Sequence, residues 1–68
     1  MKLLKTSDGK HGARIMRNGD YYDAYAVQPD GFGDYGYWYT IGTSYKTETT
    51  AIKYAKQNLA KRGYALVI

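Results

Sequence analysis

The stretch TETTAIKYAKQNLAKRGYALVI, residues 47–68, constrains the fold more than any other part of the chain. Its apolar residues recur at helical spacing, at Ala51, Ile52, Ala55 and Leu59. This spacing predicts one amphipathic helix with a narrow, alanine-rich buried side. Thr47 is typical of a helix N-cap, and Gly63 of the left-handed position that ends a helix. The mainly apolar residues 64–68 then predict a short buried strand, so the helix must pack against a sheet.

Size and charge narrow the class of protein. The chain has 68 residues and no cysteine, so we expect one domain over residues 1–68, without disulfides or thiolate metal sites. Its net charge of +4 favours a polyanionic partner and argues against a DNA mimic. The longest N-terminal apolar run, Leu3-Leu4, is too short to span a membrane. We therefore expect a soluble, cytoplasmic protein without a membrane partner.

The residues before the helix predict an antiparallel hairpin. Asn18-Gly19 is typical of a two-residue type I′ turn, which would pair Arg17 with Asp20 and Arg14 with Asp23. Alternation then assigns one face to the helix, namely Ala13, Ile15, Tyr22, Ala24 and Ala26. The residues of the opposite, open face are Arg14, Met16, Tyr21, Asp23, Tyr25 and Val27. The open face is thus predicted to be aromatic and charged.

Two further strands and a loop complete the expected sheet. Residues 1–6 predict a short edge strand, residues 28–36 a glycine-rich loop, and residues 37–45 a long strand. Strict alternation in the long strand places Ile41 in the core and Trp38 on the open face. The predicted fold is therefore α+β: an antiparallel sheet of three to five strands in the order (β)βββαβ. One C-terminal amphipathic helix packs on one face of this sheet.

No catalytic or metal-binding pattern stands out. The glycines at 31, 33 and 36 match G-x-G-x-x-G, but a dinucleotide site needs a helix after them, and here a strand is expected. His11 is the only histidine; we expect it at an exposed turn, without partners for a metal site. The six acidic residues form no convincing general acid–base pair. We predict a protein that is not an enzyme and needs no cofactor.

A three-stranded sheet followed by the helix TETTAIKYAK, with Arg14 and Trp38 on the open face, resembles AP2-like and integrase-arm DNA-binding domains. The similarity covers residues 13–62. It implies that the sheet enters the major groove of DNA, with Arg14, Arg17 and Trp38 as contacts. The architecture is also similar to that of small phage or bacterial proteins of unknown role, so fold alone does not identify a function.

Two functional hypotheses follow. The first is a small basic protein that binds DNA or RNA without catalysis. Its contacts would come from the sheet face and the helix, at Arg14, Arg17, Tyr21, Tyr25, Trp38, Lys53, Lys56 and Lys61. The alternative is a phage- or mobile-element-type inhibitor or adaptor that binds a host protein, such as a nucleic-acid-processing or defence complex, through the tyrosine-rich face. A simpler explanation of the aromatic face is a homodimer that buries it. A simpler explanation of the helix lysines is that they are only a solvated surface.

Overall fold

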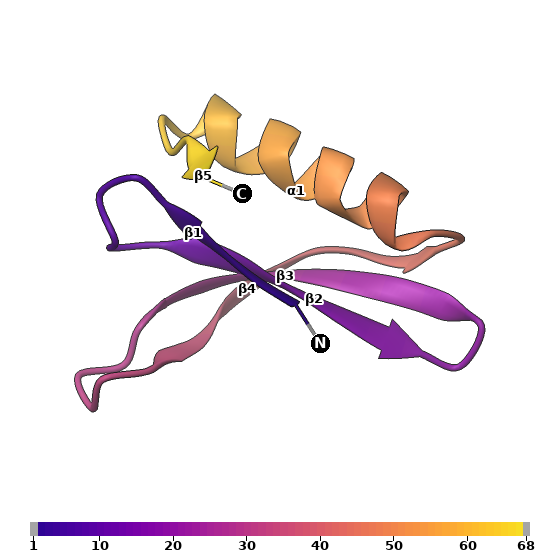
Figure 1. Ribbon diagram of the computed structural model, residues 1–68, viewed down its shortest axis with the longest axis horizontal. Helices are drawn as coiled ribbons and strands as arrows, with labels where there is room; N and C mark the ends of the chain where they lie inside the picture. Colours follow the sequence, from indigo (N-terminus) through magenta and orange to yellow (C-terminus); the bar gives the residue numbers. More distant parts are fainter. Residues whose placement is uncertain (1, 68) are drawn as a thin grey trace.

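The computed structural model describes residues 2–67 and shows a sheet with one helix across one face (Figure 1). The elements are β1 (Lys2–Thr6), β2 (Gly12–Asn18), β3 (Tyr21–Pro29), β4 (Tyr35–Tyr45), α1 (Glu48–Lys61) and β5 (Leu66–Val67). The strand order is β4-β3-β2-β1-β5, and all neighbours are antiparallel. The predicted α+β fold and element order are confirmed. The first and last residues, expected in the terminal strands, lie outside the described part.

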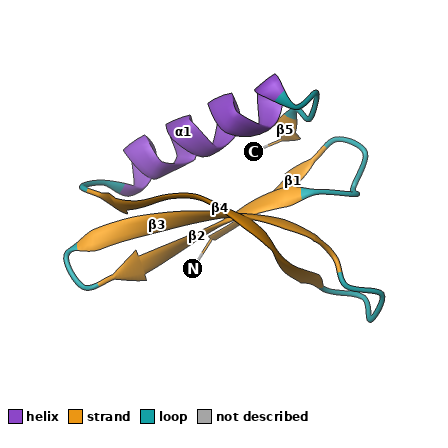
Figure 2. Ribbon diagram, turned by 180° about the vertical axis from the view of Figure 1, so that it is seen from behind, coloured by secondary structure: helices purple, strands orange, loops and turns teal. Residues whose placement is uncertain are grey.

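Helix α1 connects the two edges of the sheet. It follows β4 at one edge and leads to β5 at the other (Figure 2). Its 14 residues extend about 21 Å, close to the roughly 19 Å that four strand spacings cover. β5 forms backbone pairs with Lys5 and Thr6 of β1. The sequence predicted β1 as an edge strand, but β5 is the edge strand beside these two residues. The opposite face of the sheet has no covering element among residues 2–67.

The helix begins and ends as its sequence predicts. The Thr47 hydroxyl accepts a hydrogen bond from the Thr50 N–H at 3.1 Å, which makes Thr47 the N-cap. At the other end, Gly63 has a φ of 88°. The Tyr64 N–H donates to the Leu59 carbonyl at 2.9 Å and the Gly63 N–H to the Ala60 carbonyl at 3.0 Å. These two bonds form a Schellman motif, which satisfies two of the last helical carbonyls.

The core lies between α1 and the sheet and is built mainly from small residues. It consists of Leu4, Ala13, Ile15, Ala24, Ala26, Ala51, Ala55 and Leu59. Alanines face each other from the helix and from β2 and β3, so the helix can lie close to the sheet. Leu59 and Ile15 supply most of the remaining volume. The buried side of the helix and the covered side of the hairpin are therefore those that the sequence predicts.

The hairpin turn differs from the prediction. Asn18 pairs with Tyr21, so Gly19 and Asp20 form the turn, and Gly19 alone takes a positive φ, of 63°. This is the pattern of a type II′ turn rather than type I′. Each β2 residue consequently pairs two positions further along β3 than expected: Ile15 faces Ala24. A shift of two keeps every side chain on its face, because side chains alternate with a period of two.

Strand β4 breaks the alternation that the sequence suggested. Tyr37 pairs with Val27 and Tyr39 with Ala26, so Trp38 is an additional residue between two consecutive pairs. Such a β-bulge changes the face on which the following side chains lie. Trp38 packs against the core on the helix side, and the prediction that it lies on the open face is wrong. Ile41 packs against the core, as predicted.

The loop between β3 and β4 is shorter than expected. Pro29 and Tyr35 already pair, so the loop covers residues 30–34 rather than 28–36. The Asp30 Oδ1 atom accepts from the Phe32 N–H at 2.8 Å, which holds the turn. The strand that follows this loop rules out the helix N-terminus that a dinucleotide site would require. Phe32 is 92% exposed at the tip.

Candidate binding surfaces

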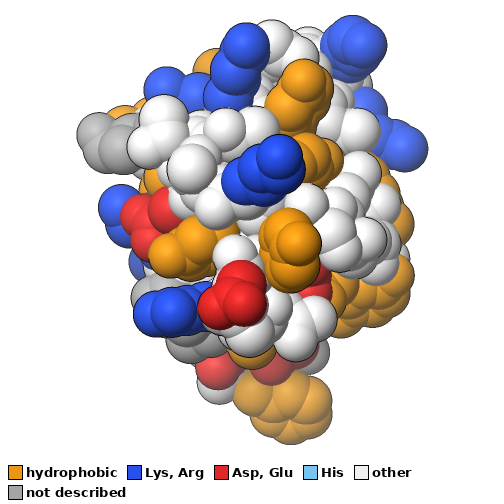
Figure 3. Space-filling model, turned by 90° about the vertical axis from the view of Figure 1, so that its right-hand side faces the viewer, with side chains coloured by type: hydrophobic (Ala, Val, Ile, Leu, Met, Phe, Trp, Pro, Cys, Tyr) orange, Lys and Arg blue, Asp and Glu red, His pale blue; other side chains and the backbone are white. Residues whose placement is uncertain are grey.

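Charge is distributed very unevenly along the chain. Residues 46–62 contain five basic residues and one acidic residue, so this segment carries a formal charge of +4. The rest of the chain contains five basic and five acidic residues, which cancel. The whole net charge of the protein therefore belongs to α1 and its two flanking turns. Figure 3 shows most Lys and Arg side chains in the upper part of the molecule, where α1 lies, and the acidic ones below.

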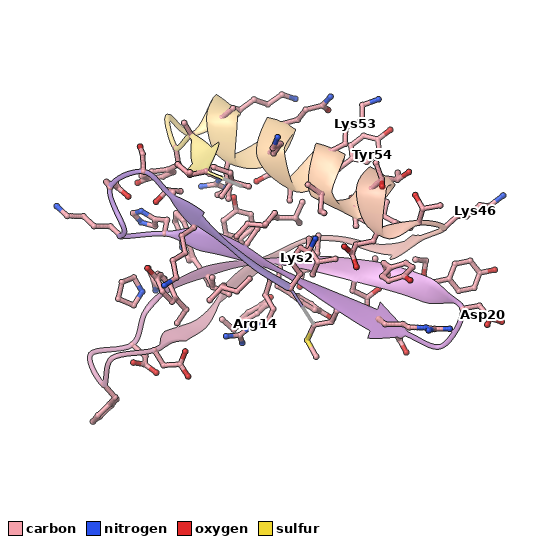
Figure 4. The ribbon with its side chains drawn as sticks, viewed as in Figure 1. Lys2, Arg14, Asp20, Lys46, Lys53 and Tyr54 are labelled. Carbon is pink, nitrogen blue, oxygen red and sulfur yellow. The ribbon has the colours of Figure 1, made fainter. Side chains whose placement is uncertain are left out.

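Three lysines form the outer surface of the helix. Lys53, Lys56 and Lys61 are exposed and lie on the side of α1 opposite the buried alanines. Lys53 points away from the sheet (Figure 4). From Lys53 to Lys61 the row extends about 12 Å along the helix axis. We call these three residues the helix ridge. All three were predicted as binding residues, and all three lie on the exposed surface of α1.

A tyrosine pair flanks the helix ridge. The rings of Tyr45 and Tyr54 stack with centroids 5.3 Å apart and an interplanar angle of 12°. The Lys53 ammonium lies 5.9 Å from the Tyr54 ring centroid, within cation–π range. Beside the pair, α1 and β4 line a hollow of about 120 Å³ that reaches Lys61. Tyr54 was not among the predicted binding residues, although its position next to Lys53 in the helix was a usable signal.

The open sheet face, which we define as Arg14, Met16, Tyr25, Val27 and Tyr37, surrounds a second hollow of about 230 Å³. Arg14 projects from the side of the sheet away from α1 (Figure 4). Its Nη2 atom donates to the Tyr35 carbonyl at 2.9 Å. The rings of Tyr25 and Tyr37 meet edge to face at 6.0 Å. Tyr21 is also on this side, near the hairpin end, and is exposed.

Asp23 does not pair with Arg14, although the predicted register placed these two opposite charges across from each other. It pairs with Met16 across the hairpin, while Arg14 pairs with Tyr25. Asp23 as a whole residue is only 5% exposed, and its carboxylate accepts hydrogen bonds from the Ser44 N–H at 3.0 Å and the Tyr25 O–H at 3.2 Å. These bonds, led by that of Ser44, hold the pKa of Asp23 below its ordinary value. Burial, and then the bond to Asp23, raises the pKa of Tyr25. Asp23 is therefore a structural acceptor.

Arg17 and Trp38 do not join the open sheet face. Arg17 shares the parity of Ile15 in β2, so it lies on the helix side of the hairpin end. It pairs with Tyr22 rather than Asp20, and its Nε atom donates to the Gly19 carbonyl at 3.0 Å. Trp38 belongs to an aromatic cluster with His11 and Tyr64, at centroid distances of 4.9 and 6.1 Å. The contact set implied by the resemblance to AP2-like and integrase-arm domains is thus divided between two faces.

His11 is half-buried in this aromatic cluster, not exposed at a turn as expected. Its ring lies 4.0 Å from that of Tyr64, centroid to centroid. The Arg62 guanidinium lies 4.4 Å from the Tyr39 ring and 5.6 Å from that of Trp38. Arg62 is therefore folded over aromatic rings at the end of α1, away from the row of lysines. The cluster joins the helix terminus to β4.

Between residues 2 and 67, no three histidine, cysteine or acidic side chains converge into a potential metal site. Nor is any helix in this range long and apolar enough to cross a membrane. No known protein family, curated protein or solved structure matches the chain. The candidate binding surfaces are therefore the helix ridge and the open sheet face, which lie on opposite sides of the molecule.

Proposed function

We propose that this protein binds nucleic acid without catalysis, and that the helix ridge, rather than the sheet face, contacts the phosphates. The observation that carries the proposal is the segregation of charge: residues 46–62 hold the entire net charge of +4. Phosphate contacts by Lys and Arg supply most of the affinity in sequence-independent binding. A net positive charge that is concentrated in one segment also orients a polyanion towards the side of the molecule on which that segment lies.

The lysines of the helix ridge are available for such contacts. The only ion pair within residues 2–67 joins the Lys2 Nζ and Glu48 Oε1 atoms at 3.0 Å, at the opposite end of α1 from Lys61. It involves the single acidic residue of the helix segment, so no carboxylate of that segment competes for the ridge. The exposed Tyr54, stacked on Tyr45, adds an aromatic surface beside Lys53 on which a base can stack.

A pair of charge-matched double variants tests this assignment. Lys53→Gln/Lys56→Gln removes two charges from the helix ridge, and Lys5→Gln/Arg14→Gln removes two from the sheet side. We expect fluorescence anisotropy with labelled single- and double-stranded DNA and RNA at low salt to show at least about tenfold weaker binding for the first variant. The second should bind within about twofold of the parent protein. The reverse pattern would move the site to the sheet, and no binding by the parent protein would refute the proposal.

A second candidate function is favoured by a different surface. Tyr37 is 63% exposed, and Met16 and Tyr21 are exposed on the same side of the sheet, where no element of residues 2–67 covers them. Aromatic residues and methionine are enriched in the centres of protein interfaces. An inhibitor or adaptor that binds a host protein would use this surface, and it could do so while the helix ridge remains free.

A further inference from the structure

The hollow in the open sheet face has an apolar floor. Val27 is 1% exposed at its base, and Met16, Tyr25 and Tyr37 form its walls. Its volume of about 230 Å³ is smaller than the roughly 300 Å³ at which pockets for drug-sized ligands begin. The hollow therefore suits a single side chain rather than a whole cofactor. The Met16 side chain is flexible, so this side of the hollow can adapt to apolar groups of different shapes.

The charge at the rim of this hollow is uncompensated. Arg14 has no acidic partner among the described residues, and its Nε atom is buried without an acceptor. Asp23, the acidic residue of the same face, is already bonded to Ser44 and Tyr25. The Lys5 ammonium, 5.4 Å from the Tyr35 ring centroid, adds a second cation on this side. An arginine fork of this kind matches the geometry of a carboxylate.

We propose that the open sheet face binds a partner protein at a hydrophobic side chain that is next to a carboxylate. The apolar group enters the hollow between Met16 and Tyr37, and Arg14 holds the carboxylate of an adjacent Asp or Glu or of a chain terminus. This inference gives the second candidate function its ligand chemistry. It is independent of the helix ridge, so each proposal can fail without the other.

Two other occupants fit the surface less well. A symmetric contact between two copies would bring two Arg14 side chains and two Lys5 side chains to the same interface, where like charges repel. A nucleic acid would be drawn to the opposite side of the molecule, where the net charge lies. Tyr25 and Tyr37 meet at 64°, so their rings do not form a parallel platform for successive bases.

An NMR titration of the ¹⁵N-labelled protein with three small probes tests the proposal. N-acetylphenylalanine supplies the side chain with a carboxylate, N-acetylphenylalanine amide lacks the carboxylate, and guanosine 5′-monophosphate represents a nucleotide. We expect the first probe to shift the amides of Arg14, Met16 and Tyr37, and the amide probe to bind about tenfold more weakly. Failure of the first probe to shift these amides, or a stronger response to the nucleotide, would overturn the proposal.

Matched variants separate the two parts of the site. Arg14→Met keeps the apolar stem but not the charge, and should abolish the preference for the carboxylate probe. Tyr37→Ser should weaken both acetylated probes, whereas Arg17→Met, on the other face, should change neither. An unchanged preference in Arg14→Met would overturn the role of Arg14. A sedimentation mass of a dimer that Tyr37→Ser converts to a monomer would show that a second copy is the occupant and would equally overturn the proposal.

Discussion

Removal of the Asp23 carboxylate should destabilise the junction between β3 and β4. Ser44 is the one non-glycine residue within 2–67 at positive φ, at 61°, and lies where the β3–β4 register shifts. Its N–H donates to Asp23 rather than to a strand partner, so Asp23→Ala leaves a partly buried donor unpaired. An unpaired donor of this kind costs about 2 kcal/mol, a large share of the roughly 3–10 kcal/mol expected for a domain of this size.

Urea denaturation followed by circular dichroism measures this cost. With a denaturant dependence of about 1 kcal/mol per molar, the midpoint for Asp23→Ala should fall by about 2 M. Asp20→Ala, in the exposed hairpin turn, is the matched control and should change the midpoint little. A free energy of unfolding for Asp23→Ala within about 0.5 kcal/mol of the parent value would refute the structural role given to this carboxylate.

The same site predicts a pH dependence. The pKa of Asp23 is lower in the folded than in the unfolded chain, so the unfolded chain binds more protons in acid. The stabilisation is therefore complete above the unfolded pKa of about 3.9 and is lost as the pH falls through the lower folded value. Asp23→Asn should lose this part of the acid sensitivity. Asp8, whose pKa is lowered by bonds from Thr6 and Lys10, will retain some. Identical pH profiles for Asp23→Asn and the parent protein would contradict the assignment.

Three further variants test the packing. A methyl group on Gly42 would collide with the Tyr45 side chain, so Gly42→Ala should displace the Tyr45 ring from Tyr54 and cost about 1–3 kcal/mol in urea denaturation. An unchanged Tyr54 ring signal by NMR would count against this contact. Leu59→Ala should lower the free energy of unfolding by about 2–5 kcal/mol, because Leu59 is fully buried. A decrease of less than about 1 kcal/mol would show that the helix is not packed as described. Arg62→Ala should shift the emission of Trp38 by removing the cation above its ring, whereas Lys61→Ala should not.

The helix was predictable because its signals are local. The Thr47 cap, the alanine spacing and the Gly63 stop are read within a few residues of each other, and all three were confirmed. The hairpin faces were also predictable despite the wrong turn. Placing the turn at Gly19-Asp20 moves the register by two residues, and an even shift leaves the faces unchanged.

Strand β4 could not be predicted in the same way, because its faces depend on bulges that the neighbouring strand fixes. Trp38 is an additional residue between Tyr37 and Tyr39, so the alternation breaks there. Tyr37 consequently lies on the open face, and Trp38 lies on the helix side, under Arg62. A strictly alternating interpretation therefore misplaced the only tryptophan. Arg17 was misplaced for a simpler reason: it shares the parity of Ile15 and belongs to the helix side.

Phosphate binding by the helix ridge predicts a steep salt dependence of duplex binding, which fluorescence anisotropy at several salt concentrations measures. If Lys53, Lys56 and Lys61 each neutralise one phosphate, log K should fall against log salt with a slope of about −2.7, which is about 40-fold between 50 and 200 mM. Lys53→Gln/Lys56→Gln should reduce the slope to about −0.9, and Lys5→Gln/Arg14→Gln should leave it unchanged. A slope that falls in the sheet variant and not in the helix variant would show that the phosphates bind the sheet and not the helix ridge.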